Sequence, residues 1–163
     1  MLEFFGIVPP ASMDGMPISS ILLGNKENQR VLLFGVFGGQ IGLYDGRYTY
    51  IRGCAKPDNN PLFSYTLMPT NMRGFFPQES LEQMQIAPGM RFTNGIPCLK
   101  IPTEICINPF YCGSLLFDIA NDPHQENNII RLPIEAEMVE KLKSVLRRID
   151  APSDVFERLG LEG

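Results

Sequence analysis

The sequence contains no tryptophan, a single histidine and only four cysteines among its 163 residues. Its 14 Lys and Arg residues are outnumbered by 18 Asp and Glu residues, so the net charge is −4. Proteins that bind nucleic acid rely mainly on Lys and Arg contacts with phosphate, which argues against a nucleic-acid partner. No apolar run approaches the roughly 18 residues that a membrane-spanning helix needs, which argues against a membrane partner.

The cysteines Cys54, Cys98, Cys106 and Cys112 include no C-x-x-C pair, the usual spacing in structural zinc sites. They are also too few for a disulfide scaffold, so we expect buried thiols in a reducing compartment. A bridge between Cys98 and Cys106 or Cys112 is the alternative. We expect neither a metal nor another cofactor. Because the first residues lack the basic segment of a signal peptide, we expect this chain to be cytoplasmic.

Glycine and proline are frequent, with 15 and 14 residues, above their usual combined share of about 12%. This composition predicts many turns and short elements, and it excludes a mostly helical bundle. At roughly 150 residues per domain, the length predicts one domain.

The clearest structural signal is a run of three β-prone segments, Val31–Phe37, Gln40–Tyr44 and Arg47–Arg52. Gly38-Gly39 and Asp45-Gly46 separate them, and both pairs are typical of two-residue hairpin turns with positive φ. These segments predict a three-stranded antiparallel meander.

Weaker patterns follow the meander. Leu62–Met68 fits a fourth strand or an extended segment beside the sheet, and Leu115–Ile119 fits a late strand. Gln78–Gln85 fits one or two helical turns. Ile86–Cys112 is rich in proline and predicts an irregular excursion.

A long amphipathic helix is expected from Pro133 until shortly before Pro152. Ser153 or Asp154 is expected to cap a final short helix that Gly160 closes. The apolar stripe of the long helix consists of Ile134, Met138, Leu142, Val145, Leu146 and Ile149.

Together these elements predict an α+β fold, in which a small antiparallel sheet of about four strands packs against a long C-terminal helix. We expect a single domain over residues 1–163. Residues 1–24 are expected to be an extended linker, and residues 25–163 to form the sheet and the helix.

Residues suited to catalysis are scarce. His124, the single histidine, lies in a polar turn and would have to serve any histidine-based nucleophile scheme. The glycines between residues 35 and 42 match neither a phosphate-binding loop nor a dinucleotide fingerprint. A small hydrolase that uses Cys54, Asp58 and His124 is one hypothesis, but the residues alone predict a domain without a self-sufficient active site.

The candidate binding residues are Arg47, Tyr50 and Arg52, which share one tyrosine-rich strand. The two arginines are able to bind an anion, although on a half-exposed strand such residues more often form a solvated face. They give a second hypothesis, a non-catalytic module that binds an anionic carbohydrate or a partner protein.

Leu33–Gly39, followed by Asp45–Arg52, resembles the hairpin in the C-terminal part of bacterial sulfatases, where a D-G-R-Y-x-Y-x-R run is familiar. Leu116–Pro123, followed by Glu126, Asn127 and Asn128, is similar to the L-Y-D-L-x-x-D-P-x-E-x-x-N-L stretch near the end of the same family. Phe117 stands in place of the tyrosine, and the acidic residue is shifted or replaced by Gln125. The opening segment, Leu2–Ile18, is similar to the stretch that leads out of the catalytic domain. The three matches occur in the family's order.

The resemblance implies that residues 25–163 are the smaller C-terminal domain, in sulfatases a four-stranded antiparallel sheet packed against a helix, and that residues 1–24 lead from the catalytic domain. The family's nucleophile arises by oxidation of a cysteine or serine in a C/S-x-P-x-R motif, and its divalent cation binds acidic residues. The sequence contains neither that motif nor an Asp-Asp pair. We therefore predict a sulfatase C-terminal domain that lacks the catalytic core, is inactive alone and has a structural or substrate-entrance role. Its expected partner is the missing catalytic domain or a second copy in a homodimer.

Overall fold

The computed structural model divides the chain into two compact units, Met1–Arg30 and Val31–Gly163. The division falls at Arg30, six residues after the end of the linker that the sequence predicts. No described helix is both long enough and apolar enough to span a lipid bilayer. The residues that the structure describes are 2–10, 13, 15, 18–24, 31–71, 74–105 and 108–161.

The first unit contains two short helical turns, η1 (Leu2–Phe5) and α1 (Ser19–Leu22). The Ser19 hydroxyl donates a hydrogen bond of 2.6 Å to the Glu3 carboxylate and so joins the two turns. Apolar side chains in the described part of this unit are largely exposed. They are Phe4, Phe5, Ile7, Val8, Met13, Ile18, Ile21, Leu22 and Leu23.

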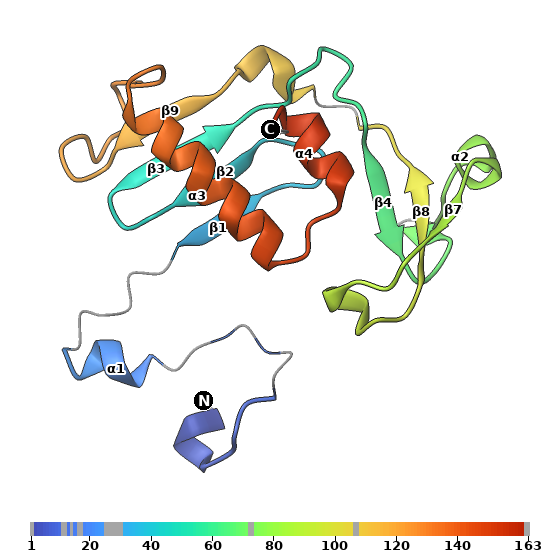
Figure 1. Ribbon diagram of the computed structural model, residues 1–163, viewed down its shortest axis with the longest axis horizontal. Helices are drawn as coiled ribbons and strands as arrows, with labels where there is room; N and C mark the ends of the chain where they lie inside the picture. Colours follow the sequence, from blue (N-terminus) through green and yellow to red (C-terminus); the bar gives the residue numbers. More distant parts are fainter. Residues whose placement is uncertain are drawn as a thin grey trace. The chain divides into compact units, whose positions relative to one another are not determined.

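The second unit is built on a four-stranded antiparallel sheet, which confirms the predicted α+β fold class (Figure 1). The strand order is β1-β2-β3-β9, so the last strand of the sequence pairs with the third. β1 and β9 are therefore the two edges of this sheet. The bounds are Leu32–Gly35 for β1, Ile41–Tyr44 for β2, Tyr48–Arg52 for β3 and Leu115–Asp118 for β9.

The two turns of the meander lie where the sequence places them, but both are longer than two residues. Residues 36–40 join β1 to β2, and residues 45–47 join β2 to β3. Positive φ occurs at Gly38 and Gly46, at 68° and 104°, and not at Gly39 or Asp45. The Asp45 carboxylate explains the second turn, because it accepts hydrogen bonds of 3.0 and 2.8 Å from the two backbone amides that follow Gly46.

The long helix α3 (Ile134–Arg148) covers one face of the sheet, as predicted (Figure 1). Side chains alternate along β3, so Tyr48 and Tyr50 both point toward the helix, and Tyr50 is fully buried. The short helix α4 (Ser153–Leu159) completes the core and ends at Gly160 in the left-handed conformation. The buried core consists of Leu43, Tyr50, Leu116, Met138, Leu142, Val145, Leu146, Leu159 and Leu161.

The segment between β3 and β9 forms a second sheet that the sequence does not predict. Its strands are antiparallel in the order β4-β8-β7, with β4 at Phe63–Thr66, β8 at Cys98–Pro102 and β7 at Gln85–Ala87. Leu62–Met68 therefore contributes to a separate sheet and not to the main one. Ile86–Cys112 is likewise not irregular throughout, because pairing with distant strands overrides its proline content.

Several short strands and helical turns lie between β4 and β9 in the sequence. The helix expected over Gln78–Gln85 ends at Glu82, because Gln85 already belongs to β7. Phe75 is 75% exposed, whereas Phe76 is buried, so only the first of this pair is available to a partner. The bounds are Thr70–Asn71 for β5, Gly74–Phe75 for β6, Gln78–Glu82 for α2, Arg91–Thr93 for η2 and Pro109–Cys112 for η3.

Three of the four cysteines lie in the described part of the chain, and all three are free thiols. Cys54 and Cys98 are buried, as predicted, whereas Cys112 is exposed. The alternative bridge between Cys98 and Cys112 is therefore wrong. Cys106 lies outside the described residues.

Candidate functional site

Arg47 and Asp118 form an ion pair at one end of the β3–β9 ladder. The Arg47 guanidinium donates from Nη2 to Asp118 Oδ2 at 2.6 Å and from Nε to both carboxylate oxygens at 3.2 Å. Tyr48 lies opposite Asp118 in the register, which brings the preceding arginine within reach. The Arg47 guanidinium holds the pKa of the Asp118 carboxyl at about 2. The Arg47 guanidinium is thus already bonded to Asp118 of the same chain, although the Arg47 side chain is 54% exposed.

A second ion pair joins the β2–β3 turn to the long helix. Lys141 of α3 reaches Asp45 with an Nζ–Oδ2 distance of 2.6 Å. Burial alone would raise the pKa of Asp45, but the bonds from Lys141 and from the turn amides outweigh it and lower the pKa. The sequence suggests Glu137 as the neighbour of Lys141 on the helix, so this cross-link to the sheet is a contact that helical spacing does not reveal.

Arg52, supported by Tyr50, binds the C-terminal end of α4. The Arg52 guanidinium donates to the carbonyl oxygens of Leu159 at 2.8 Å and Gly160 at 3.1 Å, and to the Tyr50 hydroxyl at 3.2 Å. A cation at this position satisfies carbonyl groups that a helix leaves without partners at its C-terminus. Tyr50 has no exposed surface, so it supports Arg52 from within the core.

The structure therefore does not unite the three predicted binding residues in one open site. Arg47 lies at the Asp118 end of the ladder, whereas Arg52 lies at the opposite end of β3. Each guanidinium already binds groups of the protein. Binding of an anionic carbohydrate by these residues stays a prediction.

The proposed hydrolase residues are also distributed over the fold. Cys54 follows the Arg52 end of β3, whereas His124 follows β9, whose last residue pairs with the other end of β3. Burial raises the pKa of the Cys54 thiol, which donates to the backbone oxygen of Lys56 at 3.3 Å. Within the described residues, no three His, Cys, Asp or Glu side chains gather as a group suited to a metal ion.

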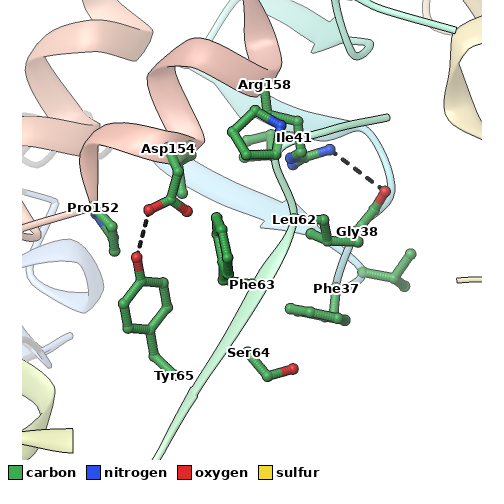
Figure 2. A pocket seen from close by; sticks show the side chains of 13 residues that line it. Phe37, Gly38, Ile41, Leu62, Phe63, Ser64, Tyr65, Pro152, Asp154 and Arg158 are labelled. Atoms are coloured by element: carbon green, nitrogen blue, oxygen red, sulfur yellow. Dashed lines mark hydrogen bonds between the residues drawn. The ribbon is translucent and has the colours of Figure 1, made fainter. Parts of the chain in front are cut away.

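The structure contains a further candidate site to which the sequence does not point. It is a cavity of about 400 Å³ between β4 and α4 (Figure 2). Figure 2 shows Asp154 and Arg158 on the α4 side of the cavity, with Phe63 and Tyr65 of β4 on the other side. The apolar lining includes Val36, Phe37, Ile41, Leu62, Phe63 and Val155.

Asp154 links the second sheet to α4 at the edge of this cavity. Its carboxylate accepts a hydrogen bond from the Tyr65 hydroxyl and another, of 3.0 Å, from Lys100 Nζ on β8. Burial, reinforced by the Asp154 carboxylate, raises the pKa of Tyr65, so its hydroxyl stays protonated as a donor. The expectation that Ser153 or Asp154 caps this helix is wrong, because Pro152 occupies the N-cap position and no side-chain cap bond forms there. The Asp154 carboxylate serves the tertiary structure instead.

Arg158 is the most deeply buried cation at the cavity, with 5% of its surface exposed. Its Nη1 donates to Gly39 O at 3.1 Å, Gly38 O at 3.4 Å and Asn59 Oδ1 at 3.0 Å. Burial lowers the pKa of this guanidinium from its usual high value. No local sequence signal marks Arg158, because it belongs to a short helix whose other charged residues are ordinary surface types.

No protein-family model matches the chain, and no curated protein matches it. The resemblance to sulfatases therefore rests on residue patterns alone. Two of the three patterned segments contribute strands to the four-stranded sheet, where Arg47 of one pairs with Asp118 of the other.

Replacing Arg47 tests the first ion pair. In Arg47→Gln, the pKa of Asp118 should rise from about 2 toward its ordinary value of about 4. Because the folded pKa is below the unfolded one, the pair stabilises the fold fully above about pH 4 and loses this effect as the pH falls toward 2. Carboxyl carbon NMR shifts followed across this range measure the change. Arg148→Gln on α3 is the matched control, and an Asp118 pKa unmoved by Arg47→Gln contradicts the assignment.

Removing one hydroxyl tests the link between the second sheet and α4. Tyr65→Phe keeps the ring and deprives the Asp154 carboxylate of a donor. We expect the free energy of unfolding in urea to fall by about 1–3 kcal/mol. Tyr111→Phe removes a hydroxyl from a side chain that is 84% exposed, and should change stability by no more than about 0.5 kcal/mol. Equal effects of the two variants would refute the link.

Proposed function

We propose that this chain contains a domain of the sulfatase C-terminal type, with a structural role and no sulfatase activity of its own. The observation that carries the proposal is the ion pair between Arg47 and Asp118. These two residues belong to two of the three segments that resemble the family, and 71 positions separate them in the sequence. The pairing of these two segments in one ladder, with their charged residues in contact, supports the proposal.

The polar residues of the second segment support the same proposal, because they shape the chain around β9. Asp122 accepts hydrogen bonds from the amides of Glu126 at 3.1 Å and Asn127 at 2.8 Å. Asn128 Oδ1 accepts from the amides of Leu116 at 3.0 Å and Ile130 at 3.1 Å. These side chains satisfy backbone donors, which is a structural role.

The chemistry of a sulfatase has no counterpart in the sequence. The 163 residues contain no C/S-x-P-x-R motif, so the residue that becomes the nucleophile is missing from them. The buried thiol of Cys54 has a raised pKa, which makes it a poor nucleophile at neutral pH. A structural role therefore agrees better with these residues than a catalytic one.

Exposed apolar residues at the β1 edge support a role in packing against another domain. Leu32, Phe34, Val36 and Phe37 are between 48% and 73% exposed. Leu33 points into the core, so Leu32 and Phe34 lie on the sheet face away from α3. Apolar surface of this kind favours association with a partner, for which we propose a catalytic domain or a second copy.

Turnover of p-nitrophenyl sulfate by the purified full chain tests the proposal. We expect no release of p-nitrophenol above buffer, with or without added Ca²⁺, under conditions in which an arylsulfatase is active. His124→Ala and Cys54→Ala should be equally inactive. Turnover that follows the protein through purification and disappears in His124→Ala would overturn the proposal and favour the hydrolase hypothesis.

A further inference from the structure

The cavity between β4 and α4 combines apolar walls with one incompletely bonded cation. Arg158 carries five N–H donors, of which the two on Nη1 already bind oxygen atoms of Gly38, Gly39 and Asn59. Across the described residues, every hydrogen bond from this guanidinium leaves from Nη1. The edge formed by Nε and Nη2 therefore keeps three donors without a protein acceptor there.

That edge has the geometry that binds an oxyanion. Two parallel N–H groups on adjacent nitrogens of a guanidinium match the two oxygens of a carboxylate, and such paired bonds are stronger than neutral ones. A buried donor without an acceptor is costly, and a buried unpaired charge costs more. An incoming anion would relieve both costs at Arg158, which is 5% exposed.

The charges around the cavity leave room for one negative charge. Asp154 also lines it, but Lys100 and Tyr65 already bind that carboxylate. Counting Arg158 and Lys100 as positive and Asp154 as negative gives a net charge of +1. A ligand with a single negative charge brings this net charge to zero, whereas a neutral ligand leaves it at +1.

The walls indicate what the anion is attached to. Phe37, Leu62, Phe63 and Val155 give the cavity a largely apolar lining, and its volume of about 400 Å³ suits a small organic molecule. Val36 and Phe37 are 73% and 54% exposed, so the cavity is open to solvent beside them. A small ring or a short aliphatic group fits this space.

We propose that the cavity between β4 and α4 binds a small organic acid with one negative charge, whose carboxylate accepts hydrogen bonds from Nε and Nη2 of Arg158. The apolar body of the acid lies between Phe63 and the β1–β2 loop. The argument for this site uses the cavity and the bonds of Arg158, and it does not use the Arg47–Asp118 pair or the proposed sulfatase relationship.

Benzoate and benzamide, which share a ring and differ in charge, test the proposal by methyl NMR titration of the full chain. Benzoate should shift the methyl signals of Val155, Leu62 and Val36 in a saturable manner. Benzamide should bind about tenfold more weakly, since it cannot form the charge-assisted pair. Equal affinities, no saturable shifts, or shifts confined to exposed apolar residues such as Ile7 would each overturn the proposal.

Variants at Val36 separate electrostatics from shape. The Val36 side chain lies against Gly39, whose carbonyl accepts a bond from Arg158. Val36→Glu places a competing carboxylate near that cation and should weaken benzoate binding about tenfold, whereas the nearly isosteric Val36→Gln should not. Because Val36 is 73% exposed, both variants should fold. Equal weakening by the two would contradict binding through charge.

Arg158→Lys tests the paired geometry itself. Lysine keeps the positive charge and loses the two adjacent N–H groups, so benzoate affinity should fall about tenfold while the methyl spectrum of the free protein keeps its dispersion. Unchanged affinity in the folded variant would overturn the role of the guanidinium edge. Should this buried substitution unfold the protein, the Val36 pair decides the question.

Discussion

β3 pairs with β9 only because residues 53–114 leave the main sheet and return to its edge. Both ends of this excursion are fixed to each other. Gly53 donates from its backbone amide to Ser114 Oγ at 3.1 Å, and a side chain at Gly53 would collide with the backbone oxygen of Gly113. At the far end of the ladder, the Ile119 amide donates to Arg47 O at 2.9 Å. This pairing completes the sheet face on which α3 packs, and it brings Arg47 and Asp118 together.

α4 depends on the same arrangement, because its charged residues bind three different parts of the unit. Arg158 binds the β1–β2 loop and Asn59, Asp154 binds the second sheet, and Lys56 reaches Glu157 at 3.0 Å. Arg52 binds the carbonyl groups at the end of the helix. Within the described residues, Arg158 differs from Arg52, because its hydrogen bonds leave from Nη1 alone whereas those of Arg52 leave from all three guanidinium nitrogens.

Much of the fold follows from local patterns in the sequence. The meander, the late strand and the long helix carry strong signals, because period-two and period-3.6 apolar spacing report directly on one-sided burial. β7 and β8 carry no such signal. β8 is bounded by Pro97 and Pro102, and it is a strand because β4 and β7 supply hydrogen-bond partners from distant positions.

The binding residues were harder to predict than the fold. The residue types of Arg47, Tyr50 and Arg52 favour an anion site, but the structure shows that each side chain is bonded within the protein. Whether an arginine side chain is available to a ligand depends on acceptors elsewhere in the chain, which local sequence does not reveal. The burial of Arg158 is equally hidden from local sequence, because it results from packing between segments that are distant in the sequence.

Arg47 and Asp118 form an ion pair that links two strands distant in the sequence. A double-mutant cycle with Arg47→Ala, Asp118→Ala and the combined variant measures this coupling in the free energy of unfolding at neutral pH. The account predicts that the combined variant loses less stability than the sum of the two single losses. Losses that add within experimental error would show that the two residues do not interact, and would contradict the account.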